Sequence, residues 1–214
     1  MYSPEGLIFL EKSRPAAYTA DVLRRAAVFI DRDGTLTEEM GYVNHPKRVR
    51  LLPRSAEAIR RLNRTGIPAV VVTNQAGVAR GYFSEDVLHA VNAAVVSLLK
   101  EAGAHLDGVY VCPHHPTEGE PPFRLDCDCR KPKAGLLHRA AAELGLDLAR
   151  STMIGDKPSD LVPARAVGAR SVLVLSGYGL GEWEYRRASF PVQPEHVAED
   201  LLDAVDWVLA GRSG

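Results

Sequence analysis

Short, unbroken apolar runs recur along this chain of 214 residues and limit its fold more than any other feature. A strand with one face in water alternates apolar and polar residues, whereas an unbroken run predicts a strand covered on both faces. Segments with apolar residues at helical spacing separate these runs, an order typical of a parallel sheet with helices on both sides. The runs predicted as strands are 26–30, 68–72, 108–111, 152–155 and 171–175.

The predicted helices lie between these strands. Ser84 is a suitable N-cap for a long amphipathic segment, and Gly66 is a suitable stop for the helix before it. The segments predicted as helices are 54–65, 84–98, 136–144, 161–167 and 199–209. We therefore expect one three-layer α/β domain over residues 26–214, preceded by an N-terminal extension over residues 1–25 that shows no clear period.

Composition excludes several classes of function. Lysine and arginine number 26 against 27 aspartates and glutamates, which gives a formal net charge of −1. This balance offers no positive surface for duplex nucleic acid or an anionic membrane. No apolar run approaches the roughly 20 residues that span a bilayer, and the first residues lack the features of a secretory signal. We expect a cytoplasmic monomer that binds neither nucleic acid nor membranes.

Charged and polar side chains follow the predicted strands at the point where each one ends. Because the carboxyl ends of parallel strands meet at one edge of a sheet, we expect these side chains to converge in a crevice. Clustered carboxylates suit Mg²⁺, and cationic side chains with a threonine hydroxyl suit phosphate oxygens, so the pattern predicts a phosphoryl-transfer site. The residues are Asp31, Asp33, Thr73, Asn74, Arg130, Lys131, Asp156, Lys157 and Asp160.

Each of these segments also has an ordinary structural interpretation. An Asp-Gly pair after a strand is a common turn, a Thr-Asn pair at a strand end often caps it, and an Arg-Lys pair is usually a solvated charge pair. Their occurrence together, each beside an apolar strand, favours a functional site over four unrelated turns.

The four segments resemble the four motifs of the haloacid dehalogenase (HAD) superfamily of phosphatases. They are Asp31-Arg32-Asp33-Gly34-Thr35, Thr73-Asn74-Gln75, Arg130-Lys131-Pro132 and Gly155-Asp156-Lys157-Pro158-Ser159-Asp160. From about residue 26 to 177 the chain is similar, more narrowly, to the heptose bisphosphate and histidinol-phosphate phosphatases. The resemblance implies a Rossmann-like, HAD-like fold, and the short intervals between the motifs leave no room for a large cap domain.

The resemblance also implies catalytic roles. Asp31 would be the nucleophile that forms an aspartyl-phosphate, and Asp33 would protonate the leaving oxygen and then deprotonate the attacking water. The expected ligands of Mg²⁺ are Asp31, the backbone carbonyl of Asp33, and Asp156, with Asp160 supporting them. Thr73 and Lys131 would stabilise the phosphoryl oxygens. Lys133 is a rival for the lysine role, which the spacing alone leaves open.

The expected substrate is a small phosphorylated sugar. Similarity in the segments 41–43 and 77–81 favours removal of the 7-phosphate of D-glycero-D-manno-heptose 1,7-bisphosphate, although Ala76 stands where the resemblance predicts a serine. The alternatives are a histidinol-phosphate phosphatase and, in another class, a receiver-like domain phosphorylated on aspartate without turnover. Residues expected to bind substrate are Arg32, Glu39, Met40, Gly41, Tyr42, Asn74, Gln75, Ala76, Arg130 and Lys157.

All three cysteines of the chain fall within residues 112–129. Cys112, Cys127 and Cys129, together with a histidine, would give a tetrahedral shell suited to Zn²⁺. His114 and His115 are both candidates for the fourth ligand, and the C-x-H…C-x-C pattern of the resembled families favours His114. Four protein ligands would leave no open position, so we expect a structural zinc that folds this loop and positions Arg130-Lys131 after it.

Overall fold

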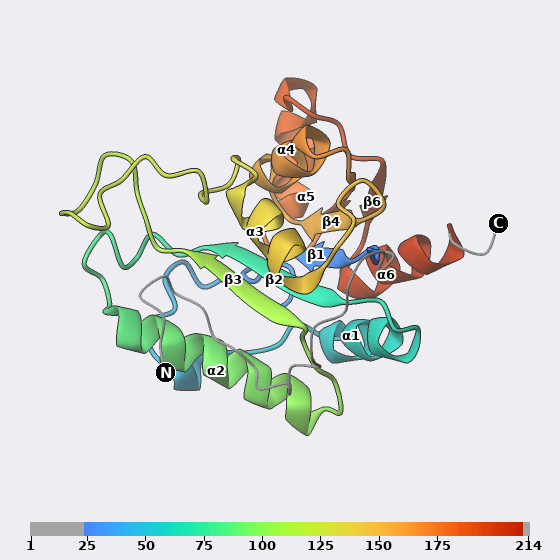
Figure 1. Ribbon diagram of the computed structural model, residues 1–214, viewed down its shortest axis with the longest axis horizontal. Coiled ribbons are helices and arrows are strands. Elements are labelled where there is room, and N and C mark those ends of the chain that lie inside the picture. The colour runs from blue at the N-terminus through green and yellow to red at the C-terminus, as the bar shows by residue number, and fades with distance from the viewer. Residues whose placement is uncertain (1–23, 212–214) are drawn as a thin grey trace, which may run out of the picture.

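The computed structural model describes residues 24–211 and places six parallel strands of this range in one sheet, in the order β3-β2-β1-β4-β5-β6 (Figure 1). All five strands expected from the apolar runs are present, with ends that differ by at most two residues. The strands are β1 (Val28–Ile30), β2 (Ala69–Asn74), β3 (Gly108–Cys112), β4 (Thr152–Gly155), β5 (Arg170–Val174) and β6 (His196–Ala198).

Helices cover both faces of the sheet, with α1, α2 and α6 on one side and α3, α4 and α5 on the other (Figure 1). This confirms the expected three-layer α/β/α architecture. None of the helices within residues 24–211 combines the length and hydrophobicity of a membrane span. The helices are α1 (Ser55–Arg64), α2 (Glu85–Glu101), α3 (Gly135–Leu144), α4 (Pro158–Ala166), α5 (Gly179–Arg186) and α6 (Leu201–Ala210), with short 3₁₀ turns η1 (Pro46–Arg48) and η2 (Arg187–Ser189).

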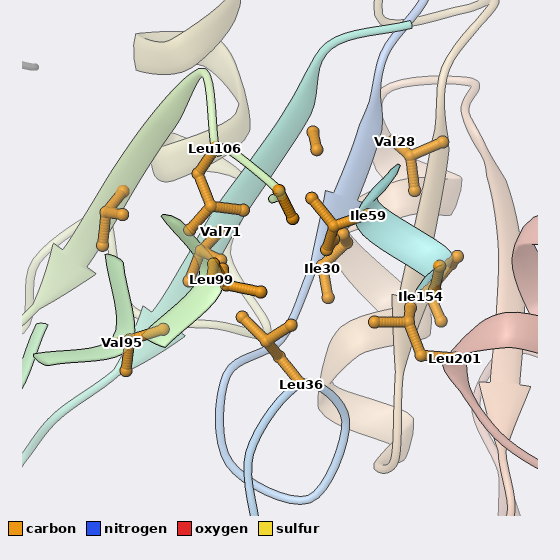
Figure 2. Packing of buried hydrophobic residues seen from close by; sticks show 14 of the residues in the cluster. Val28, Ile30, Leu36, Ile59, Val71, Val95, Leu99, Leu106, Ile154 and Leu201 are labelled. Atoms are coloured by element: carbon orange, nitrogen blue, oxygen red, sulfur yellow. The ribbon is translucent and has the colours of Figure 1, made fainter. Parts of the chain in front are cut away.

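The unbroken apolar strands are explained by two cores, one on each face. Val28 and Ile30 of β1 pack with α1, α2 and α6, whereas Phe29 between them packs on the opposite face with α3. Figure 2 shows the first of these cores, in which Ile59 and Leu99 lie against the sheet. Each such side chain contributes roughly 1.5–3 kcal/mol through burial.

Two of the differences between predicted and observed ends bear on the site. The strand expected to end at residue 72 continues to Asn74, so Thr73 and Asn74 are part of β2 and pair with β3. The helix expected from residue 161 begins at Pro158. Proline suits the first position of a helix, because the backbone N–H that it lacks would have no partner within the helix there. The start of this helix is closed by a hydrogen bond from the Lys157 backbone N–H to Asp160 Oδ2 (3.1 Å).

The sequence-based prediction missed β6 and α5. β6 has three residues, which are too few to show a period. In α5 the buried residue is Gly179, so this helix has no stripe of buried apolar side chains that the sequence could reveal. The predicted N-terminal extension lies almost entirely outside the described residues. Of its last two residues, Arg25 forms backbone hydrogen bonds with Gly145 and Asp147.

The strand order places a crevice at the centre of the sheet. From β1 the chain adds β2 and β3 on one side and then returns to add β4, β5 and β6 on the other. The connections leaving β1 and β4 therefore diverge at the carboxyl ends of these two neighbouring strands. Ligands of open α/β sheets bind at such a switch point.

Candidate active site

A cavity of about 420 Å³ opens at this switch point. Most of the residues expected to form the site line it, and they come from the ends of β1 and β2, the loop before α3 and the turn before α4. The sequence-based prediction missed Ser159 and Tyr178. The lining residues are Asp31, Asp33, Glu39, Gly41, Tyr42, Thr73, Asn74, Gln75, Ala76, Arg130, Lys131, Lys157, Ser159 and Tyr178.

Two residues expected to bind substrate are not part of this lining. Arg32 and Met40 instead border a small separate hollow on the far side of Asp33. Arg32 is only 1% exposed, and its guanidinium faces the protein interior. Residues in an irregular turn follow no fixed period, so the sequence could not show that Arg32 points away from its two neighbours.

Asp31, the predicted nucleophile, is held through one oxygen. Its Oδ1 accepts hydrogen bonds from the backbone N–H of Arg32 (2.7 Å) and from Lys131 Nζ (2.9 Å). The carboxylate is buried at the end of β1 but still borders the cavity. A fixed, desolvated carboxylate beside a cationic group is suited to attack on an electrophile.

Lys131 borders the cavity and joins the ends of β1 and β2 to α4. Its Nζ contacts Asp31 Oδ1 (2.9 Å), Asp160 Oδ1 (2.7 Å) and the Val72 carbonyl oxygen (2.9 Å). Burial alone would lower the pKa of Lys131, but the charges of Asp160 and Asp31 outweigh it and raise that pKa. Lys133 pairs instead with Asp126 at 2.5 Å, so the geometry favours Lys131 for the role that the sequence left open.

Three carboxylates gather around the point where Asp31 borders the cavity, and two of them, Asp156 and Asp160, are fully buried. Asp31, Asp156 and Asp160 each offer an oxygen within 4.8 Å of the others. Burial, and then the charges of Asp31 and Asp160, raise the pKa of Asp156 to about 8. Asp156 Oδ2 accepts from the backbone N–H of Tyr178 (2.9 Å), whereas its buried Oδ1 has no hydrogen-bond partner among the described residues. A hard divalent cation such as Mg²⁺ fits this donor set and would relieve the repulsion.

Two glycines make room for Asp156. A Cβ atom on Gly34 would lie 2.2 Å from Asp156 Oδ2, and one on Gly177 would lie 2.4 Å from it. Both glycines have positive φ, at 83° and 58°, which disfavours a side chain for a second reason. The close approach of these two backbones fixes the position of the Asp156 carboxylate.

Asp33, the predicted acid–base residue, is bound on both oxygens. Arg32 donates from Nε to Oδ1 (3.0 Å) and from Nη2 to Oδ2 (2.8 Å), a two-point contact. Gln75 Nε2 donates to Oδ2 (2.7 Å) and also to Thr73 Oγ1 (3.0 Å), and Thr37 Oγ1 lies 3.3 Å from Oδ1. The carboxylate therefore has a defined orientation at the edge of the cavity.

Asn74 and Arg130 also hold the backbone in place. The Asn74 amide donates to the Lys131 carbonyl (2.9 Å) and accepts from the Lys131 N–H (3.0 Å), which fixes this residue against β2. Arg130 Nη1 donates to the His114 carbonyl (3.1 Å). Both residues still border the cavity, where they can reach a ligand.

The rim of the cavity carries a cation above an aromatic ring. Lys157 Nζ lies 4.2 Å from the ring centre of Tyr178 and 3.2 Å from Glu39 Oε2. Burial acts to lower the pKa of Lys157, but the nearby charges of Asp156 and Glu39 raise it. Glu39 Oε1 also accepts from the Gly41 N–H (2.7 Å), so the loop over residues 39–42 is tied to this lysine.

The cysteine loop after β3, yellow-green at the left of Figure 1, brings four possible metal ligands together. Cys127 Sγ lies 3.5 Å from Cys112 Sγ and 3.2 Å from Cys129 Sγ, and His114 Nδ1 lies 3.8 and 3.4 Å from Cys112 and Cys129. Ligand atoms around one tetrahedral Zn²⁺ lie roughly 3.5–3.8 Å apart, so this set fits zinc. His115 faces Arg80 (3.2 Å) instead, which favours His114 as the fourth ligand.

Comparison with known proteins shows the family to which the chain belongs. A family model described as "HAD-hyrolase-like" matches residues 128–204. The D-glycero-D-manno-heptose-1,7-bisphosphate 7-phosphatase of Thermosynechococcus vestitus is 43% identical over 190 residues, which cover 86% of this chain and 95% of that protein. The D-glycero-beta-D-manno-heptose-1,7-bisphosphate 7-phosphatase of Escherichia coli K12 is 38% identical over 183 residues, covering 86% and 87%.

A solved structure shows the same fold. The D,D-heptose 1,7-bisphosphate phosphatase from B. bronchiseptica, complexed with magnesium and phosphate, superposes with a TM-score of 0.75 at 31% identity, covering 87% of this chain and 99% of that one. The chain therefore belongs to the HAD superfamily and is a phosphatase. Within that superfamily its relatives include the D-glycero-D-manno-heptose-1,7-bisphosphate 7-phosphatases.

Proposed function

We propose that this protein removes the 7-phosphate of D-glycero-D-manno-heptose 1,7-bisphosphate through an aspartyl-phosphate on Asp31, in a reaction that depends on Mg²⁺. The observation that carries the proposal is the convergence of Asp31, Asp33 and Lys131 on one cavity. Relatives that are 36–43% identical carry this activity in their names, which supports the choice of substrate.

In the first step, the Asp31 carboxylate attacks phosphorus and the bond from phosphorus to the sugar oxygen breaks. Lys131 and the buried Arg32 N–H already hold Asp31 Oδ1, so attack falls to Oδ2. Asp33 gives its proton to the departing sugar oxygen. Lys131 and Thr73 border the cavity, where they would stabilise the charge that spreads onto the phosphoryl oxygens.

In the second step, Asp33 takes a proton from a water molecule that attacks the same phosphorus. The bond from phosphorus to Asp31 breaks, inorganic phosphate leaves and the Asp31 carboxylate is restored. One carboxyl group thus serves as acid and then as base, which returns the protein to its starting protonation state.

The residues that would hold Mg²⁺ are Asp31, Asp156 and the backbone carbonyl of Asp33. Bound Mg²⁺ would neutralise the negative charge that the carboxylates and the phosphoryl group bring together. Asp160 supports the site through Lys131, which it holds at 2.7 Å. The related enzyme from B. bronchiseptica was solved in complex with magnesium and phosphate, which supports the proposed dependence on Mg²⁺.

We propose a structural Zn²⁺ at Cys112, His114, Cys127 and Cys129. Because all four tetrahedral positions would be filled by protein, this metal would take no part in the reaction. Its role would be to order the loop that ends at Arg130-Lys131. Arg130 is bound to this loop through its hydrogen bond to the His114 carbonyl.

The substrate is tested by parallel assays of phosphate release from the heptose bisphosphate and from histidinol phosphate with Mg²⁺ present. We expect a higher kcat/KM for the heptose bisphosphate, and the reverse order would overturn this choice. Asp31→Asn should lose turnover by orders of magnitude while remaining folded. Transfer of a single phosphoryl group to each chain, with one equivalent of dephosphorylated product, no free phosphate and no turnover, would favour the receiver-like alternative.

A further inference from the structure

Arg32 is a fully buried cation that does not border the substrate cavity. Its side chain is 1% exposed, and the cavity that it borders is the small hollow behind Asp33. Removing a guanidinium from water costs several kcal/mol unless its N–H groups are paired. Its hydrogen bonds run to both oxygens of Asp33 and to the side chain of Asn92.

Asn92 is a polar residue on the buried face of α2. The other buried residues of this helix are all apolar, namely Leu88, Val91, Val95 and Leu99. Asn92 is itself 1% exposed, and its Oδ1 accepts a hydrogen bond from Arg32 Nη1 at 2.8 Å. This contact joins α2, which takes no other part in the site, to the turn that carries the two catalytic carboxyl groups.

The three contacts of Arg32 determine the plane of its guanidinium. Nε and Nη2 hold the two oxygens of Asp33, and Nη1 is anchored on Asn92 in another direction. Because the guanidinium is planar, an anchor on Nη1 also fixes the direction of the other two N–H groups. The orientation of the Asp33 carboxylate therefore depends on a residue of α2.

We propose that Asn92 and Arg32 are positioning residues that hold the Asp33 carboxyl group in the orientation needed for both of its proton transfers. This inference rests on the proposed acid–base role of Asp33. Neither residue borders the substrate cavity, so their loss slows the proton transfers and leaves substrate binding unchanged.

The first measurement separates kcat from KM in Asn92→Ala. Without the anchor, Arg32 can turn and Asp33 is left with its bonds to Gln75 and Thr37. A shift of about 1 Å in a catalytic group costs up to about 10²-fold, so we expect kcat to fall about 10- to 100-fold with KM unchanged. A rise in KM at unchanged kcat would contradict the inference.

Rapid mixing with p-nitrophenyl phosphate provides a second readout. Nitrophenolate leaves without needing a proton, so transfer of the phosphoryl group to Asp31 does not require Asp33, whereas hydrolysis of the aspartyl-phosphate does. Asn92→Ala should therefore release about one nitrophenolate per chain in a fast initial phase, at the rate of the unaltered protein, and then turn over slowly. Equal slowing of both phases would overturn the inference, since it would indicate a disturbed Asp31.

Two variants serve as controls. Leu99→Ala removes another fully buried side chain of α2, two turns from Asn92, and should lower the melting temperature without changing kcat or the initial phase. Asn92→Asp keeps an acceptor for Arg32 Nη1 and should restore turnover to within a few-fold of the unaltered protein.

Arg32→Lys keeps the buried charge but loses the two-point contact, so it supports the same test if Asn92→Ala does not fold. Arg32→Lys should give the same fast initial phase. The losses of kcat in Arg32→Lys and Asn92→Ala should not add in the double variant, because both substitutions act through the Asp33 carboxylate. Normal kcat in both folded variants, with Asp33→Asn inactive, would overturn the positioning role alone. Normal turnover of Asp33→Asn would instead refute the proposed acid–base mechanism.

Discussion

Gly34→Ala tests whether the placement of Asp156 depends on the close approach of the turn after β1. The added Cβ would lie 2.2 Å from Asp156 Oδ2 and 3.1 Å from the Cα of Gly177. The added Cβ would be crowded by both groups, and the side-chain carboxylate of Asp156 can shift more easily than the Gly177 backbone. Moving Oδ2 to an ordinary contact distance displaces it by about 1 Å.

The expected effects follow from two separate causes. The backbone conformation at Gly34, with φ at 83°, costs any other residue about 1–2 kcal/mol, which lowers Tm by roughly 2–8 °C in a chain of this size. The shift of a proposed Mg²⁺ ligand by about 1 Å should lower kcat by about 10²-fold and raise the Mg²⁺ concentration needed for half-maximal activity.

A matched control separates the two causes. Gly66 has a similar φ of 70°, but a Cβ there would meet nothing within 4 Å. Gly66→Ala should therefore lower Tm by a similar amount and leave both kcat and the Mg²⁺ dependence unchanged. The measurements are thermal unfolding and phosphate release over a Mg²⁺ titration. Equal activity of the two variants would refute the reasoning about Asp156.

The remaining predictions concern the buried lysine and the two metals. Lys131→Met leaves Asp31 and Asp160 without their shared cation, so turnover should be lost and stability should fall by about 3–5 kcal/mol in urea unfolding, whereas Lys133→Met should change neither. Wild-type stability of Lys131→Met would contradict the pairing. Cys129→Ser should lower the zinc content found by elemental analysis, and an unchanged content would count against the Cys/His site. Chelation should abolish phosphate release, and added Mg²⁺ should restore it; full activity in chelator would exclude the proposed requirement.

Much of the site could be predicted from sequence because strand ends are easy to recognise. Residues that directly follow a buried parallel strand lie at one edge of the sheet, so Asp31, Asp33 and Thr73 could be placed together without coordinates. Tyr178 lies in the turn after β5 and carries no charge or motif that marks it, although it both borders the cavity and donates its N–H to Asp156.

The amino-acid sequence by itself determined the layered fold and the residues at its central edge, since unbroken apolar runs and strand-end motifs depend only on local order. The tertiary structure decided which neighbours face the crevice. Arg32 lies between two residues that border the cavity yet turns inward to Asn92, and Lys131 rather than Lys133 reaches Asp31. Side chains in irregular turns take their direction from whatever packs against them, and those partners come from distant parts of the chain.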